Sequence, residues 1–581
     1  MVLRLPSLLR LLCVCLALTG GVSARAAGAA VVLQVPDALR PLLEKHLDFL
    51  DLEPDQRFDA NAQVALMRRA RKEISEMLAT EGYFSPTIER QDLEEGRFAV
   101  VVNPGVRTNI SSVDLRFTGD LAREDGDRPA RLAALRSSWG LRVGQPFRQA
   151  DWDAAKQRLL DALSTREYAA ANIVDSQAVI NPETASAELK VEVDSGPVFR
   201  FGPLQVSGLS DYEVSLVERY RPPEVGELYS QERLLRFLTA LQNTSYFASV
   251  VVDIDRSTST PEAVPVRVTV TEAKPRRIGF GGGISSNTGY RVETSYRDAH
   301  FMGRPWTLVS GVRLEQRRQL GYADVFLPPS MSGYLDSAGV LAEHTNISGL
   351  QTQRQSIGVV RTIPSGRMEN RFALNYQQEI LTPEGSVRSS RSALTANWSW
   401  TYRAVDDILD PRRGQVFNFQ MGGAARALLS DRNFVRLYGR YQHFFPVAER
   451  DVVIVRAEGG ITVAAARDGV PQDFLFRTGG AQTVRGYAYQ SLGVTEGSAT
   501  VGGRYLAVTS AEYVHWYGGN WGVAAFVDAG NANDERALFK MNLGYGFGPR
   551  WRSPAGPIAV DLAYGQSDHR VRLQFAVAIA F

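Results

Sequence analysis

The stretch at residues 394–402, LTANWSWTY, alternates apolar and polar residues without interruption. Successive side chains of a β-strand point to opposite faces, so each class of residue occupies one face of the strand. The apolar face holds Leu394, Ala396, Trp398, Trp400 and Tyr402. The stretch therefore predicts a strand that has water on one side and an apolar environment on the other.

The same alternation recurs along the C-terminal half of the chain. From residue 276 to residue 581 the helical period is absent, and about sixteen segments are typical of strands, an even number that suits an antiparallel barrel. A soluble β-sandwich also alternates, but about 305 residues is long for that fold, and Trp, Tyr and Phe gather on the apolar face as in lipid-facing girdles. We expect a transmembrane antiparallel β-barrel of 16 strands at 276–581.

The first predicted strand of this barrel, residues 278–286, IGFGGGISS, must pair with the last strand to close it. Interior glycines weaken a strand because they cost conformational entropy and add no packing. Two interpretations stay open, a bulge or tight corner and a lateral seam that opens; a phosphate loop is disfavoured because no Lys-Ser/Thr follows. The candidate seam residues are Gly279, Gly281, Gly282, Gly283 and Phe581.

A long glycine-rich segment, residues 474–487, FLFRTGGAQTVRGY, interrupts the predicted strands. Long loops in compact folds are commonly either functional or disordered. Glycines allow close backbone packing, and the single arginine near the end offers a rigid fork of donors. We therefore select as a candidate site the loop motif Thr483, Val484, Arg485, Gly486 and Tyr487.

The N-terminal half contains three similar segments between about residue 28 and residue 275. Each has an apolar-striped helix that ends at a tyrosine, Tyr83, Tyr168 or Tyr246, and the tyrosines are 85 and 78 residues apart. Two strands follow each tyrosine, the second at 98–102, 187–193 and 264–270. Repetition at this interval indicates tandem α+β modules. We predict modules at 27–110, 111–197 and 198–275, although three unrelated α+β domains would give a similar pattern.

Helix boundaries in these modules follow from capping residues. Asp151 and Ser230 are predicted N-caps of the helices in the second and third modules. An apolar stripe near the start of the chain is assigned to an opening helix of the first module: Ala38, Leu39, Leu42, Leu43, His46 and Leu47.

Residues 1–26 are typical of an export signal, with Arg4 and Arg10 before an apolar core that is too short to span a bilayer. Cys13 and Cys15 both lie inside it, so the mature chain has no cysteine, which fits the bacterial envelope. No later apolar run is long enough for a transmembrane helix. The net charge of +2 indicates no nucleic-acid partner.

The repeats resemble POTRA domains, the periplasmic modules of outer-membrane assembly factors. TVRGY at 483–487 is similar to the VRGF/Y motif of the BamA-type assembly and secretion superfamily. FVDAG at 526–530 resembles its F-x-D-x-G strand motif, and residues 544–561 resemble its penultimate hairpin. A terminal Phe581 is similar to the sorting signal of outer-membrane barrels. The resemblance covers the whole mature chain.

The resemblance implies a periplasmic POTRA region followed by a barrel in the bacterial outer membrane. It implies that the loop folds back into the barrel and that Arg485 pairs with Asp528 of the strand motif Phe526, Asp528 and Gly530. A planar guanidinium and a lumenal carboxylate suit such a bidentate pair. Glu512 also matches a strand position of the family.

Three modules resemble the TamA branch of this superfamily, whereas two-partner secretion transporters have two modules and a plug helix. The TamA resemblance implies an assembly factor that helps insert proteins such as autotransporters, through client binding at the modules and a lateral seam. It implies three partners: unfolded outer-membrane clients, a TamB-like inner-membrane-anchored protein and outer-membrane lipid. A two-partner-type pore for one dedicated protein is the alternative.

Catalysis is not expected. The chain has neither a G-x-S-x-G elbow nor an H-E-x-x-H zinc motif, and its 6 histidines are scattered. We therefore expect no enzyme activity, cofactor or metal.

Overall fold

The computed structural model describes residues 31–51, 60–93, 98–257, 259–553 and 556–577. The predicted signal at 1–26 and the predicted seam residue Phe581 lie outside these residues. Residue contacts divide the chain into two compact units. One contains the first two modules and part of the third, and the other contains the rest of the third module together with the C-terminal barrel.

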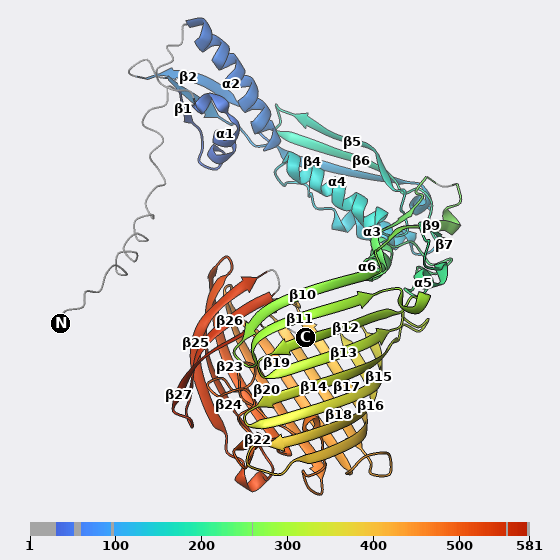
Figure 1. The fold of residues 1–581 in the computed structure, drawn as a ribbon. Coiled ribbons are helices and arrows are strands. Elements are labelled where there is room, and N and C mark those ends of the chain that lie inside the picture. The colour runs from blue at the N-terminus through green and yellow to red at the C-terminus, as the bar shows by residue number, and fades with distance from the viewer. Residues whose placement is uncertain (1–30, 52–59, 94–97, 258, 554–555, 578–581) are drawn as a thin grey trace, which may run out of the picture. The chain divides into compact units, whose positions relative to one another are not determined.

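Each N-terminal module is a three-stranded sheet with two helices (Figure 1). In the first, β1 (Val31–Gln34) and β2 (Thr87–Asp92) flank β3 (Phe98–Asn103), with α1 (Arg40–His46) and α2 (Ala60–Thr80). In the second, β4 (Asn109–Thr118) and β5 (Asn172–Asn181) flank β6 (Ser186–Asp194), with α3 (Arg128–Ser138) and α4 (Gln149–Ser164). In the third, β7 (Phe201–Ser207) and β8 (Phe247–Ile254) flank β9 (Val264–Glu272), with α5 (Val214–Glu218) and α6 (Gln231–Gln242).

The spacing of apolar residues along the strands and helices explains how these modules fold. In the second module the alternate residues of the central strand β6 and one stripe of α4 form a buried core: Ala187, Leu189, Val191, Val193, Trp152, Ala155, Leu159 and Leu163. Tyr168 and Tyr246 are buried where the helix gives way to a strand, and Tyr83 is partly buried at the same point of the first module. Three tandem α+β modules are thus present, each with the predicted junction.

The two capping predictions had different outcomes. The Ser230 hydroxyl accepts the backbone N–H of Arg233 at 3.3 Å, so Ser230 caps α6 as predicted. The prediction for Asp151 was wrong, because α4 already begins at Gln149 and Arg148 occupies the N-cap position, where its side chain makes no capping hydrogen bond. Asp151 lies in the first helical turn instead, where its negative charge still complements the helix dipole.

The apolar stripe near the start of the chain belongs to the first module. Leu43 of α1 is fully buried, and Leu39 and Leu47, which flank the helix, are also buried. All three pack in one cluster with Ile74 and Leu78 of α2. The predicted opening helix is therefore part of the core of the first module.

The C-terminal half is one antiparallel sheet of 16 strands, in which each strand pairs with the next along the chain (Figure 1). This confirms the predicted number of strands. The strands are β10 (Arg276–Ser285), β11 (Gly289–Asp298), β12 (Thr307–Glu315), β13 (Arg318–Phe326), β14 (Leu335–Ile347), β15 (Leu350–Ser365), β16 (Met368–Pro383), β17 (Ser389–Val405), β18 (Gly414–Ala424), β19 (Phe434–Ala448), β20 (Asp451–Ala464), β23 (Tyr505–Gly518), β24 (Trp521–Asn533), β25 (Asn542–Ser553), β26 (Gly556–Gly565) and β27 (Arg570–Val577). We call the end of the barrel at which β10 begins the near end.

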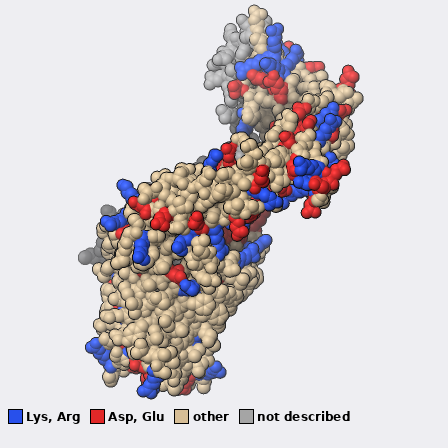
Figure 2. Space-filling view, turned by 90° about the vertical axis from the view of Figure 1, so that its right-hand side faces the viewer, with Lys and Arg blue, Asp and Glu red and all other residues tan. Residues whose placement is uncertain are grey.

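The outer surface of the barrel is apolar in a broad band. On the face that Figure 2 shows, charged residues gather toward the two ends of the barrel and are sparse between them. Outward side chains such as Phe280, Leu573 and Phe547 are 84%, 64% and 61% exposed, which is costly in water and suits a lipid environment. Among the described residues no helix is long and apolar enough to cross a membrane.

A carboxylate organises the part of the third module that groups with the barrel. Glu272, at the end of β9, accepts the backbone N–H groups of Ser210, Asp211 and Tyr212 at 2.9, 3.0 and 3.1 Å. The Tyr212 hydroxyl in turn donates to the carbonyl of Ala299 in the barrel turn after β11, at 3.3 Å. Burial opposes ionisation of Glu272, but these hydrogen bonds prevail and hold its pKa below the ordinary value.

This arrangement predicts an acid-sensitive joint. Because the folded-state pKa of Glu272 lies below the unfolded value of about 4.3, its stabilisation is complete above that pH and is lost as the pH falls through the folded-state pKa. Glu272→Gln should reduce the hydrogen-exchange protection of amides 210–212 about tenfold at neutral pH. Glu262→Gln, an exposed position of the same module, is the control; equal protection in the two variants would contradict this role for Glu272.

Candidate functional site

The first and last strands of the barrel meet without a ladder. Every other neighbouring pair in the sheet is joined by backbone hydrogen bonds, but no ladder joins β10 to β27 in the described part of the chain. One side chain links the two edges: the Ser286 hydroxyl donates to the carbonyl of Phe575 at 3.2 Å and accepts its N–H at 3.3 Å. The barrel is therefore nearly closed, and its weakest line is the seam between β10 and β27.

The glycines of β10 do not form a bulge. The strand pairs with β11 over 10 residues without a shift in register, so the bulge interpretation of the sequence was wrong. A side chain would also fit at two of them, since a Cβ at Gly282 or Gly283 would come no closer than 3.7 or 3.5 Å to another atom. Close packing therefore does not explain these two glycines, and the tight-corner interpretation stays a prediction. Without side chains they also weaken the strand at the seam.

The long loop between β20 and β23 lies inside the barrel. It spans residues 465–504 and contains a short 3₁₀ turn (Gln472–Phe474) and the hairpin of β21 (Val494–Glu496) and β22 (Ala499–Val501). The predicted motif is largely buried: Val484 and Tyr487 are fully buried, and Arg485 is 4% exposed. A loop between two lipid-facing strands that is buried to this degree must occupy the lumen.

Arg485 is held by three carboxylates on the inner wall. Its Nε and Nη2 donate to the two oxygens of Asp528 at 2.7 and 2.9 Å, and its backbone N–H reaches Asp528 at 3.0 Å. Its Nη1 donates to Glu512 at 2.6 Å and to Asp561 at 3.3 Å. The implied contact between Arg485 and Asp528 is therefore present, within a larger network than the resemblance implied.

A second arginine completes the network. Arg550 of β25 donates from Nε and Nη2 to Glu512 at 3.0 and 2.7 Å, and from Nη1 to Asp561 at 2.6 Å. Glu512 and Asp561 thus each bridge the loop arginine and the wall arginine. Because β23, β24, β25 and β26 each supply one residue, the network ties four adjacent strands to one point of the loop.

The charges of this network are compensated. Burial alone would lower the pKa of the Arg485 guanidinium, but the hydrogen bonds and the charge of Asp528 raise it above the ordinary value. The arginine therefore stays protonated. Its guanidinium also lies 3.4 Å from the ring centroid of Phe526, the first residue of the predicted strand motif, in cation–π geometry.

Glycines allow the loop backbone to lie directly on the wall. A Cβ at Gly544 of β25 would lie 1.8 Å from the carbonyl oxygen of Arg485, and a Cβ at Gly530 would lie 2.8 Å from Val484. Gly486 itself has φ +92°, and a Cβ there would lie 2.7 Å from the backbone of Tyr564. These are the positions at which the motif and both strands require glycine.

The same loop segment also contacts the last strand. The Gly486 N–H donates to the side-chain carbonyl of Gln574 at 3.1 Å, and the Gln574 amide donates to the carbonyl of Tyr487 at 2.8 Å. Arg572 of β27 donates to the carbonyl of Gly486. Tyr487 donates to the carbonyl of Leu543 at 2.9 Å. The edge strand β27 is thus attached to the loop as well as to β26.

A second set of contacts holds the start of the loop to strands in the first half of the sheet. Glu379 of β16 accepts the backbone N–H of Gln472 at 2.8 Å, and Arg391 of β17 donates to the carbonyl of Val470 at 2.6 Å. Arg354 of β15 forms an ion pair with Asp473. The loop therefore spans the lumen as a brace between two groups of strands, β15–β17 and β23–β27.

The sequence motif identified one end of this brace and missed the other. Arg550, Glu379 and Arg391 were not candidates, although all three are charged residues that the alternation of their strands places on the lumenal face.

Two further sets of candidate residues lie outside the network. Thr483 lies at its edge, where the Thr483 carbonyl accepts a hydrogen bond from Arg456 at 3.1 Å. Gly279, Gly281 and Gly283 lie on the opposite face of β10 from the exposed Ile278 and Phe280.

Loss of the loop arginine should destabilise the barrel. Arg485→Gln leaves three buried carboxylates with only one arginine, and removing one partner of a buried ion pair costs about 3–5 kcal/mol. Arg504→Gln, at the end of the same loop, removes a more exposed pair with Asp534, which follows β24, and should cost about 1 kcal/mol. Urea unfolding of the barrel in lipid bilayers measures both values. Equal losses would contradict a special role for the network.

The two ends of the brace should differ in their sensitivity to trypsin once one end is released. Arg391→Met removes the donor to Val470 and should make trypsin cut faster after Arg467 and Arg477, because the start of the loop is released. Cleavage after Arg485 should stay absent while its network persists. Arg371→Met, a lumen-facing arginine of β16, is the matched control. Slow cleavage in both variants would show that Arg391 does not hold the loop.

Comparison with known proteins agrees with this architecture. Residues 274–581 match the family model described as the Omp85 superfamily domain, and residues 125–196 match a POTRA model described as a surface antigen variable number repeat. A BamA outer membrane protein assembly factor from Nitratidesulfovibrio vulgaris is 23% identical over 364 residues, which are 58% of this chain and 45% of that protein. The chain therefore spans about half the length of this curated relative.

A solved structure shares the fold. The crystal structure of BamA from Haemophilus ducreyi lacking POTRA domains 1–3 has a TM-score of 0.64 at 16% identity, and the match covers 80% of this chain and 98% of that chain. CdiB from Escherichia coli has a TM-score of 0.44 at 13% identity, with 90% and 97% covered. The expected POTRA modules followed by a 16-stranded barrel are confirmed. Because the Omp85 domain covers just over half of the chain, this protein belongs to the Omp85 superfamily.

Proposed function

We propose that this protein is an assembly factor of the TamA branch that inserts client proteins into the outer membrane. The observation that carries the proposal is the seam between β10 and β27, where no ladder joins the edges in the described residues. Two edge strands with unpaired backbone groups are a template for a further strand. A client strand that adds to this edge would pass directly into the lipid.

The brace makes the two edges unequal. The last strand is attached to the loop by Gln574 and Arg572, whereas in the described residues no hydrogen bond or ion pair joins the loop to β10. On its other side, β10 is held by its ladder with β11 and by the ion pair of Arg276 with Asp298, and it carries four glycines. Opening of the seam would therefore move β10 away from a fixed β27. The energy would come from the pairing and burial of the client strands.

The modules would bring clients and partners to the barrel. Each sheet has two edge strands, and edges of this kind bind extended chains by strand addition. Unfolded outer-membrane proteins such as autotransporters are the proposed clients, and a TamB-like protein anchored in the inner membrane is the proposed partner. The modules would lie in the periplasm, and no enzymatic step is proposed.

A two-partner-type secretion pore is the alternative. Such transporters carry a plug helix before their modules. Here the first described helix is α1. Its residue Leu43 and the flanking residues Leu39 and Leu47 pack together in the core of the first module. The helix is therefore used as a structural part of the module, and this favours assembly over secretion through the lumen.

Closing the seam covalently tests the proposal. Because the mature chain is expected to lack cysteine, Ser286→Cys with Phe575→Cys gives a single crosslink where hydrogen bonds link the two edges. The crosslinked protein should insert an autotransporter barrel into proteoliposomes at least tenfold more slowly, and a reducing agent should restore the rate.

A matched pair separates this effect from general rigidity. Val292→Cys with Leu314→Cys joins β11 and β12 at positions that already face each other in a ladder, and this crosslink should leave insertion unchanged. Full insertion with the seam closed would contradict lateral opening. Export of a soluble substrate through the lumen with the seam closed would instead support the pore.

A further inference from the structure

An apolar groove lies on the outer face of the barrel, across β14 to β18, and encloses about 690 Å³. Its walls are large side chains that remain about half exposed, namely Val359, Phe372, Leu374 and Met421 at 53, 46, 48 and 45%. These residues alternate with the lumenal positions of their strands, so the groove opens toward the membrane. These are the fifth to ninth of the sixteen strands, so the groove is far from the seam along the sheet.

Small residues create the hollow. Ala338 and Ala396 face outward on β14 and β17, in the same row as Val359 and Leu374, with which they pair in the ladders. A larger side chain at either position would fill the space between those neighbours. The groove is thus a feature of side-chain size at two outward positions.

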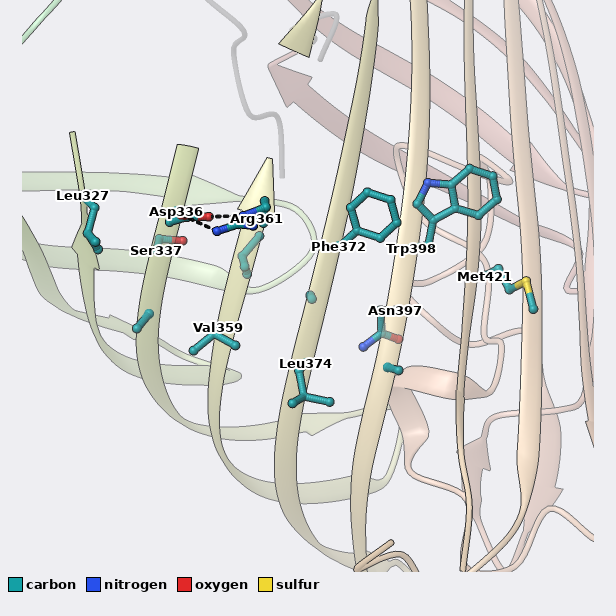
Figure 3. Close-up of a pocket in the computed structure, with 14 residues that line it drawn as sticks. Leu327, Asp336, Ser337, Val359, Arg361, Phe372, Leu374, Asn397, Trp398 and Met421 are labelled. Atoms are coloured by element: carbon teal, nitrogen blue, oxygen red, sulfur yellow. Dashed lines mark hydrogen bonds and ion pairs between the residues drawn. The ribbon is translucent and has the colours of Figure 1, made fainter. Parts of the chain in front are cut away.

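An ion pair lies at one end of the groove. Arg361 donates from Nε and Nη2 to the two oxygens of Asp336 at 2.8 and 2.9 Å, and Figure 3 shows the pair in line with Phe372 and Trp398 on the next strands. These two contacts use two of the five N–H groups of the guanidinium, and three remain for a ligand. The arginine is 54% exposed at its side chain, so these groups are accessible.

The aromatic residues place this pair at the surface of the membrane. Trp398, Trp400 and Tyr402 follow one another on the outward face of β17 toward the near end, and they contact Phe417 and Phe419 of β18. A band of this composition is typical of the headgroup level, where an outward charge costs little. The second row of the groove, with Val359 and Leu374, lies farther from the near end and therefore deeper in the hydrocarbon.

We propose that the groove binds one phospholipid of the leaflet at the near end of the barrel. The headgroup phosphate would accept hydrogen bonds from the free N–H groups of Arg361, and a headgroup amine would contact Asp336. One acyl chain would lie along Val359, Leu374 and Met421, over Ala338 and Ala396. A phosphatidylethanolamine, which carries a phosphate and an amine, matches both charges.

Such a lipid would connect five adjacent strands on their outer side, far along the sheet from the seam. The brace connects β15–β17 to β23–β27 on the inner side. The lipid and the brace would both restrain strands in the middle of the sheet. Movement would therefore be concentrated at the strands nearest to the seam. The binding site itself does not depend on the proposed function.

The test titrates phosphatidylethanolamine into the delipidated full-length protein in detergent and counts bound lipid by native mass spectrometry. Wild type should bind one lipid at saturation. Ala396→Leu, which fills the hollow, and Arg361→Gln, which removes the phosphate contact, should each weaken binding about tenfold. Ala323→Leu on the outward face of β13 and Arg276→Gln, which breaks the ion pair with Asp298 at the near end, are controls that should bind as wild type.

A second lipid tests the role of the charges. Diacylglycerol, which lacks the phosphate, should bind wild type about tenfold more weakly than phosphatidylethanolamine and should be insensitive to Arg361→Gln. The heat-dependent gel mobility of each variant checks that its barrel is folded. Equal binding of the two lipids, equal losses in groove and control variants, or no bound lipid in the wild type would each overturn the proposal.

Discussion

The guanidinium of Arg485 is the interaction on which the lumen is organised. It contacts Asp528, Glu512 and Asp561, and each of these carboxylates belongs to a different strand. A buried carboxylate without a partner is costly, so the three acids and the arginine stabilise one another only when the loop is in place. The position of the loop and the identity of Arg550 as a second partner both depend on this requirement.

The glycines of the wall follow from the same contact. The loop backbone can reach the carboxylates only if it lies against β25 and β26, and Gly544 leaves room for the Arg485 carbonyl there. In β10 the glycines have a different origin, because a side chain would fit at Gly282 and Gly283. Glycine is therefore a packing requirement on one side of the seam and a source of weakness on the other.

Much of the architecture is predictable from the sequence, and the limits are physical. The period of 2 in segments such as 394–402 predicts the strands, and the order of strands then follows because each antiparallel neighbour is next in the chain. The pair of Arg485 and Asp528 was implied by family resemblance alone. The contact between Gln472 and Glu379 joins residues 93 positions apart, and alternation shows only that Glu379 faces the lumen, not which loop residue it meets.

The brace determines which edge of the barrel is free to move. The loop is attached to β27 through Gln574 and to β15–β17 through Glu379 and Arg391, so both groups of strands are held at fixed separation. Strands β10 to β14 lie between these groups on the side that contains the seam, where no ladder joins β10 to the described part of β27. Among the described contacts, a displacement of β10 breaks its ladder with β11, the Arg276–Asp298 ion pair or the Ser286 contact, whereas a displacement of β27 would also break the loop contacts. Rigidity at the center of the lumen and mobility at one edge are two consequences of the same loop.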